Sequence, residues 1–215
     1  MHYITVAPNG VIGQHSHANR PTIEYMLHGT AAETKKGEDG KVVVKRISVN
    51  ETEISTVAIT HWWKNESREM VKIMAMDIWV DDGTGSSICR PQGKRRTEPL
   101  QPPSSPNNVK REDMGSLELS GQFPDIAEAR NYVFRSRRLT LLPGQKTPLQ
   151  DGTGNPSITY IIAGDVWENR SDEASSIRRT GEYSVAGNGI SFYWENTTIN
   201  PVILWVVDIV KKPGQ

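Results

Sequence analysis

The sequence predicts an all-β protein built from two copies of one antiparallel module, either a sandwich or a barrel. The composition is rich in Val, Ile, Thr and Trp, it includes 18 Gly and 13 Pro, and the apolar stretches are short. Expected strands recur at intervals of roughly ten residues, with turn-forming residues between them. In addition, the second half of the chain repeats the first half. Length, at 215 residues, is ample for a real hydrophobic core.

Strands in the first part of the chain follow from runs of β-branched and aromatic residues. Turn formers separate these runs: Pro8 to Gly10 ends the first run, Pro21 opens the second and Gly29 closes it. The expected strands cover residues 3–6, 22–27, 42–44, 56–59 and 70–80. We therefore expect an N-terminal domain over residues 1–80.

A polar segment follows over residues 81–114. Residues 83–87 and 99–108 are poor in apolar side chains and dense in turn formers, so we expect a Pro/Gly/Ser-rich linker that is extended or mobile. The C-terminal domain then spans residues 115–215, and one short helix is expected at residues 125–130.

The internal repeat has two offsets. A shift of 135 residues aligns the first block without a gap, and a shift of 131 residues aligns the second block, with the difference falling at the loop 35–41. Matching turn and core residues across two blocks indicate two copies of one β module. The matched pairs include Pro8 with Pro143, Tyr25 with Tyr160, Gly29 with Gly164, Glu33 with Glu168, Trp63 with Trp194, Asn65 with Asn196 and Asp77 with Asp208.

Histidines are confined to the first copy: all five lie within the first 61 residues. His15 and His17 alternate along an expected strand, which puts both imidazoles on one face about 7 Å apart. His61, arriving from a distant strand, would complete a metal site. The repeat replaces these positions with Gln150, Gly152 and Phe192. Because the matched turn and core residues persist while these three change together, we predict a metal site in the first copy alone.

These residues resemble the two signature motifs of the cupin superfamily. His15-x-His17 precedes a strand that ends at Gly29, and His61 is followed by Asn65. The duplication makes the chain similar to a bicupin. The resemblance implies two antiparallel, jelly-roll-like β-barrels, with one divalent metal ion in the N-terminal barrel on His15, His17 and His61. The C-terminal barrel would be a degenerate copy without metal ligands.

The glutamate of the family's first motif would fall at position 22, which is Thr22 here. Glu24 lies two residues further on, and on a regular strand it shares the same face. Three interpretations stay open: Glu24 is a fourth metal ligand, a catalytic base beside the metal, or neither.

The ligand set leaves the identity of the metal open. Neutral imidazoles suit Fe, Ni, Mn, Cu and Zn, and none of the spacings selects among them. Three protein ligands leave positions for water, dioxygen or a chelating substrate. Arg20 is a candidate contact for an anionic substrate, and Met26 and Trp63 are candidates for the cavity wall. The simpler alternatives are a solvated charge for Arg20 and core packing for Met26 and Trp63.

Composition argues against several classes of partner and location. Lys plus Arg equals Asp plus Glu at 25 each, which disfavours nucleic acid and anionic membranes. The chain has no long apolar run and no signal-peptide core, and its single cysteine, Cys89, excludes an internal disulfide. We therefore expect a soluble, cytoplasmic protein with a small-molecule substrate. The resemblance to cupins that pair barrels through edge strands implies a homodimer.

The sequence thus favours a metal-dependent enzyme acting on a small organic substrate. The resemblance implies a cupin-type (di)oxygenase as the first hypothesis. A metal-dependent isomerase, cyclase or lyase is the alternative within catalysis and would not need oxygen as a reactant. A non-catalytic cupin that binds a small ligand is the alternative from a different class.

Overall fold

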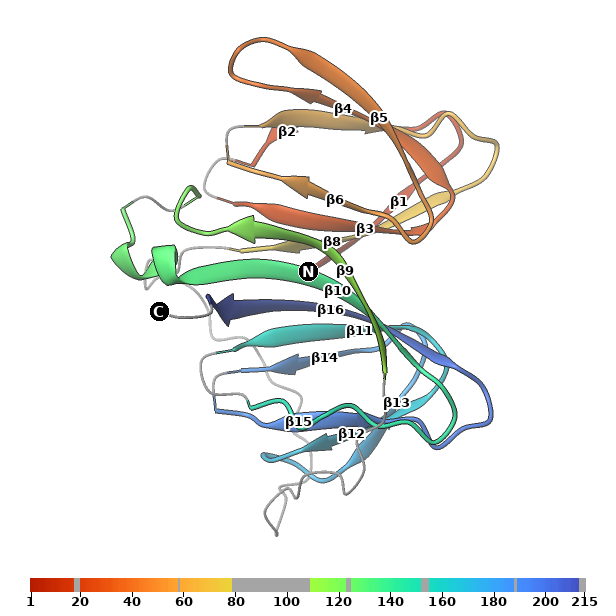
Figure 1. Cartoon of the computed structure of the whole chain (residues 1–215). Helices are drawn as coiled ribbons and strands as arrows, with labels where there is room; N and C mark the ends of the chain where they lie inside the picture. The colour runs from red at the N-terminus through yellow and green to blue at the C-terminus, as the bar shows by residue number, and fades with distance from the viewer. Residues whose placement is uncertain are drawn as a thin grey trace. The chain divides into compact units, whose positions relative to one another are not determined.

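The computed structural model of the chain is almost entirely β-structure (Figure 1). It describes residues 1–17, 20–57, 59–78, 109–122, 125–151, 155–187 and 189–212. Over these residues the strand pairs with a defined register are all antiparallel, and the one helix is the 3-10 turn η1 (Ala127–Asn131). None of the described residues forms a helix long and apolar enough to cross a membrane. The predicted all-β class is confirmed.

Two compact units make up the chain. Unit 1 comprises Met1–Ser86 and Leu117–Arg130, and unit 2 comprises Ser87–Ser116 and Asn131–Gln215. Each unit contains two sheets, and within the described ranges no closed barrel is found.

Unit 1 has two four-stranded sheets. The first contains, in spatial order, β1 (His2–Val6), β8 (Val71–Asp77), β3 (Thr22–His28) and β6 (Thr52–Ser55). The second contains β2 (Val11–Ser16), β7 (Thr60–Lys64), β4 (Thr30–Lys36) and β5 (Val42–Ser48).

Unit 2 repeats these pairings. Its five-stranded sheet contains β14 (Tyr183–Ala186), β11 (Ser157–Ala163), β16 (Val202–Lys211), β10 (Tyr132–Leu141) and β9 (Lys110–Glu118). Its three-stranded sheet contains β13 (Ser176–Arg178), β12 (Val166–Arg170) and β15 (Phe192–Glu195). Thr22 pairs with Asp77 in unit 1, and the aligned Ser157 pairs with Asp208 in unit 2. The pairing therefore reproduces the alignment read from the sequence.

Each unit has its own hydrophobic core. Trp63 in unit 1 and Trp194 in unit 2 are both 1% exposed and belong to their respective core clusters. Full burial of a large apolar side chain stabilises a fold by about 1.5–3 kcal/mol. The remaining members of the unit 1 cluster are Val6, Met26, Ala31, Ile47, Val71 and Ile73.

Most expected strands are present, but the one at 56–59 is wrong. Strand β6 ends at Ser55, and the chain reverses before β7 begins at Thr60. The Ile59 amide donates to the Thr56 carbonyl at 3.1 Å, as in a turn. The segment connects β6 in one sheet to β7 in the other, and this connection overrides the preference of its β-branched residues for extended structure.

The predicted linker extends too far. Residues 81–108 lie outside the described residues, but Lys110–Glu118 form strand β9. This strand pairs with β10, and Glu112 accepts a hydrogen bond from Arg138 Nε at 2.8 Å. Partnership with β10 thus stabilises a segment whose polar composition predicted a linker. The helix expected at 125–130 is present as η1.

Two turns recur in both units. Gly29 and Gly164 have φ values of 79° and 86°, in the left-handed region that favours glycine. The Asn65 side-chain amide donates to the carbonyl oxygens of Val6 and Glu69, as Asn196 does to those of Leu141 and Asn200. The same asparagine therefore stabilises the equivalent turn in both units.

Replacing Gly29 with alanine should destabilise unit 1 by about 2–3 kcal/mol, because left-handed backbone costs a side-chain-bearing residue about 1–2 kcal/mol and packing adds to this. A Cβ at this position would lie 3.0 Å from Val71 Cγ2 and 3.1 Å from the Met70 carbonyl oxygen. Urea denaturation followed by tryptophan fluorescence would measure the change.

Gly40 is the matched control. Its φ is 77°, and no atom of the described residues lies within 4 Å of an added Cβ. Gly40→Ala should therefore cost only the backbone contribution of about 1 kcal/mol. Equal losses for the two variants would show that packing around Gly29 adds nothing.

Candidate metal centre

Three histidines converge because two neighbouring strands present them to one another. Strands β2 and β7 are paired, and His15 lies directly opposite His61. His17 follows the end of β2, with its main-chain amide 3.5 Å from the Ile59 carbonyl oxygen. His17 and His61 are buried, whereas His15 is half-buried. The predicted three-histidine cluster is therefore brought together.

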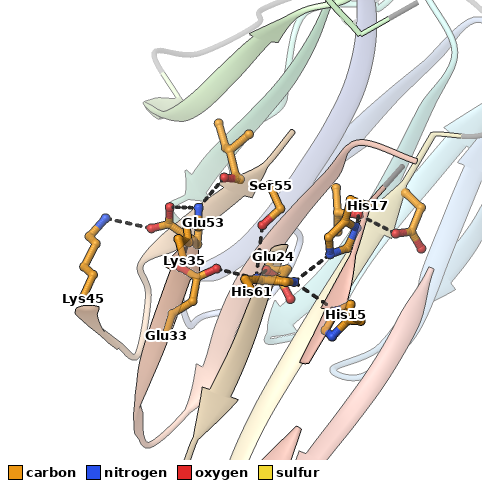
Figure 2. Close-up of polar contacts among 12 residues, drawn as sticks. His15, His17, Glu24, Glu33, Lys35, Lys45, Glu53, Ser55 and His61 are labelled. Carbon is orange, nitrogen blue, oxygen red and sulfur yellow. Dashed lines mark hydrogen bonds and ion pairs between the residues drawn. The ribbon is translucent and has the colours of Figure 1, made fainter. Parts of the chain in front are cut away.

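The same edge of each imidazole points into the cluster (Figure 2). His61 Nε2 lies 2.7 Å from His17 Nε2 and 3.0 Å from His15 Nε2. One candidate ligand atom from each histidine lies within 4.8 Å of the other two.

The outer nitrogen of each ring faces an oxygen acceptor. His15 Nδ1 lies 2.8 Å from the Gly13 carbonyl oxygen, and His61 Nδ1 lies 2.6 Å from Glu33 Oε1. His17 Nδ1 lies 2.6 Å from Thr22 Oγ1, whose own proton goes to Asp77 Oδ1 at 2.6 Å. This hydrogen-bond network assigns the proton of each neutral imidazole to Nδ1.

With protons on all three Nδ1 atoms, three Nε2 lone pairs face one another without a hydrogen between them. A cation at the centre would remove the repulsion between these lone pairs. Three ligands at right angles, each about 2.1 Å from one ion, would lie about 3 Å apart. The three-histidine group therefore fits a divalent transition metal ion.

Burial keeps the rings of His17 and His61 neutral near pH 7. Burial, reinforced by His61 and His15, lowers the pKa of His17 to about 4. Burial, reinforced by His15, lowers the pKa of His61 to about 3. A neutral imidazole is the form that binds a metal ion, so these two rings are ready ligands near pH 7.

Glu24 belongs to a different cluster. Its carboxylate groups with Glu33 and His61, and its Oε2 lies 4.0 Å from His61 Nδ1, the nitrogen that faces away from the other histidines. Glu24 is 4% exposed, and its Oε2 has no hydrogen-bond partner among the described residues. Burial, reinforced by Glu33, raises the pKa of Glu24 to about 8. The carboxyl group is therefore protonated near neutral pH.

The expected substrate contacts occupy contrasting environments. Arg20 Nε lies 3.7 Å from Asp77 Oδ1. Met26 is 1% exposed within the hydrophobic core of unit 1. Trp63 lies in the same core, with its ring centroid 6.3 Å from that of His61.

Three residues around the histidines were not predicted as part of the site: Thr22, Glu33 and Asp77. In the sequence, Thr22 marks only the absence of the family's glutamate. Glu33 and Asp77 stand out only as residues that recur in the repeat. A buried acid retained in both copies is a signal for a structural carboxylate, but the sequence alone does not show which histidine it contacts.

Among the residues that the structure describes, the aligned place in unit 2 has no comparable set of ligands. Gln150 and Phe192 form an isolated β-bridge, just as His15 faces His61 in unit 1. Phe192 is 5% exposed and belongs to the hydrophobic core. Gly152, which aligns with His17, lies outside the described residues.

No family model and no curated protein sequence matches the chain. Solved structures match it along nearly its whole length. A deletion mutant of Bacillus subtilis oxalate decarboxylase matches with a TM-score of 0.64 and 15% identity, covering 98% of this chain and 68% of that chain. The formate complex of Lactobacillus farciminis oxalate decarboxylase matches with a TM-score of 0.66 and 13% identity, covering 97% and 78%.

A third structure comes from work on the Mn(II) centres of the Bacillus subtilis oxalate decarboxylase. It matches with a TM-score of 0.64 and 14% identity, covering 99% of this chain and 68% of that chain. At these identities the likeness shows the fold.

Replacing His15 with alanine should lower the affinity for a divalent transition metal by on the order of a hundredfold or more, because one of three ligands is lost. His15 is half-buried, so the variant should still fold. Elemental analysis after dialysis, with circular dichroism as the folding check, would measure both effects.

Gln150→Ala is the matched control, because Gln150 aligns with His15 in the repeat. Its metal content should equal that of the wild type. Stoichiometric metal in His15→Ala, or an equal loss in Gln150→Ala, would contradict the assigned site.

Proposed function

We propose that the chain is a cupin-type, metal-dependent enzyme acting on a small organic substrate, and the fold that it shares with these oxalate decarboxylases supports the proposal. The observation that carries the proposal is the convergence of three Nε2 atoms whose rings are anchored through Nδ1. We assign the two units to two cupin modules, of which the first holds the metal. The homodimer and the cytoplasmic location stay predictions.

In this proposal His15, His17 and His61 hold one divalent transition metal ion. When bound, the ion supplies Lewis-acid chemistry and a binding point for substrate oxygen atoms. Three protein ligands leave coordination positions open for the substrate. The metal is Fe, Ni, Mn, Cu or Zn, and the donor set accommodates each of them.

Glu24 is assigned to proton handling rather than to coordination. Its carboxyl group lies near the Nδ1 edge of His61, whereas the metal position lies beyond Nε2. Because its pKa is raised to about 8, the Glu24 carboxyl group holds a proton on one oxygen near neutral pH. It can donate that proton as a general acid. Arg20 is assigned to the orientation of an anionic substrate, and Met26 and Trp63 to the apolar surroundings of the site.

Two reaction classes compete within the proposal. The structural likeness to oxalate decarboxylases favours a lyase that cleaves a bond next to a carboxylate. The open three-histidine coordination favours the (di)oxygenase that the sequence motifs suggested. We place the lyase first, because the solved structures of similar fold are decarboxylases.

Turnover of small carboxylic acids by the metal-loaded protein, without net consumption of dioxygen, is the expected result. Protein reconstituted separately with Mn(II), Fe(II), Ni(II), Cu(II) and Zn(II) would be assayed on small mono- and dicarboxylates, diketones, phenols and flavonols. An oxygen electrode would record oxygen uptake while released carbon dioxide is measured. His15→Ala, prepared identically, is the control for activity from free metal.

Uptake of one dioxygen molecule per product molecule would contradict the lyase proposal and identify an oxygenase. No turnover with any metal, combined with saturable binding of a small ligand, would overturn the enzyme proposal and favour a binding module.

A further inference from the structure

Both units bury a carboxylate at the same place. Glu33 on β4 and Glu168 on β12 are each 1% exposed, and they pair across the sheet with Trp63 and Trp194, respectively. Each glutamate is followed two residues later by a cationic side chain. Unit 2 therefore shows how this buried acid is neutralised when no histidine stands beside it.

In unit 2, both oxygens of Glu168 are occupied by cations. Oε1 accepts from Arg170 Nη1 at 3.0 Å and from the Ser184 hydroxyl, and Oε2 accepts from Arg178 Nε at 2.6 Å. Phe192 occupies the position that His61 has in unit 1, and its side chain has no hydrogen-bond donor for this carboxylate.

Unit 1 differs at the positions that contact this carboxylate. The strand register makes Glu53, Ile47 and His61 of unit 1 equivalent to Ser184, Arg178 and Phe192 of unit 2, respectively. Unit 1 therefore lacks the hydroxyl and the guanidinium that contact the buried glutamate in unit 2. It has an imidazole N–H in their place.

Glu53 also draws the remaining cation away from Glu33 (Figure 2). Lys35 Nζ lies 2.5 Å from Glu53 Oε1 and 2.5 Å from the Ile54 carbonyl oxygen, but 3.6 Å from Glu33 Oε2. The corresponding Arg170 instead contacts its buried glutamate directly. Glu33 Oε1 is left to accept from His61 Nδ1 at 2.6 Å.

We propose that Glu33 is a positioning residue of the metal centre. By accepting the Nδ1 proton of His61, it keeps the Nε2 lone pair directed at the other two histidines. Without that acceptor the proton could move to Nε2, 2.7 Å from His17 Nε2, and form a hydrogen bond where the metal would bind. The consequence for the metal rests on the proposed function, whereas the tautomer does not.

The test compares two variants of nearly equal size in the full chain. Glu33→Gln keeps an oxygen acceptor, and Glu33→Met has similar length without one. Long-range ¹⁵N–¹H NMR on metal-free, histidine-labelled protein reports the tautomer of His61. Competition with a chromophoric chelator reports the dissociation constant for Zn(II).

Glu33→Met should lose the single Nδ1–H tautomer of His61 and weaken Zn(II) binding by about 10–100-fold. Glu33→Gln should keep that tautomer and lose less than about tenfold in affinity. Ser55→Ala is the control, because the Ser55 hydroxyl lies at the longer distance of 3.3 Å from the same nitrogen. Its tautomer and affinity should match the wild type.

Unchanged tautomer and affinity in Glu33→Met would overturn the proposal, as would an equal effect of Ser55→Ala. A wild-type protein that shows the Nδ1–H tautomer but does not bind Zn(II), Mn(II) or Fe(II) would instead refute the metal centre while leaving the role of Glu33 in orienting His61 intact.

Glu53→Ser tests the same assignment without touching the buried glutamate, because it introduces the residue found in unit 2. Lys35 should then turn toward Glu33 and compete with His61. Zn(II) affinity should fall by a few-fold, and Lys35→Met in the same background should restore it. Wild-type affinity in Glu53→Ser would contradict the role of Glu53.

Discussion

The register between β2 and β7 is the constraint on which the site depends. It sets His15 directly opposite His61, and a shift at the irregularity between Ile12 and His15 would carry the ring to a different position or face. His17, just beyond the end of β2, then completes the cluster from the same segment. The sheet therefore determines which atoms meet before any metal is bound.

Each ring is also oriented from outside the cluster. A main-chain carbonyl holds His15, a threonine linked to an aspartate holds His17, and a glutamate holds His61. Oriented imidazoles bind metal ions more tightly, because their tautomer and direction need not be established on binding. The three imidazoles are thus preorganised by strand geometry and by the hydrogen-bond acceptors of their Nδ1 atoms.

The duplicated architecture shows how the same buried acid has different partners in the two units. A buried glutamate followed two residues later by a cationic side chain occurs in both units, so the scaffold tolerates a carboxylate inside each unit. In unit 2 arginines neutralise it, and a phenylalanine fills the space beside it. In unit 1 the imidazole of His61 takes that space, and its Nδ1 lies 2.6 Å from the equivalent carboxylate.

The β class, the repeat and the three histidines can be predicted from the amino-acid sequence, because alternation, turn residues and spacing are visible along the chain. Features that depend on strand pairing become visible only in the folded chain. Thr56 and Ile59 are joined by a turn hydrogen bond because the chain passes there from β6 in one sheet to β7 in the other. Lys110 to Met114 are in a strand because β10 lies beside them. Likewise, Glu24 and Glu33 are indistinguishable as acids in the sequence. Only the fold brings Glu33 to within 2.6 Å of His61 Nδ1 and leaves Glu24 Oε2 at 4.0 Å, because that choice depends on which strands are neighbours.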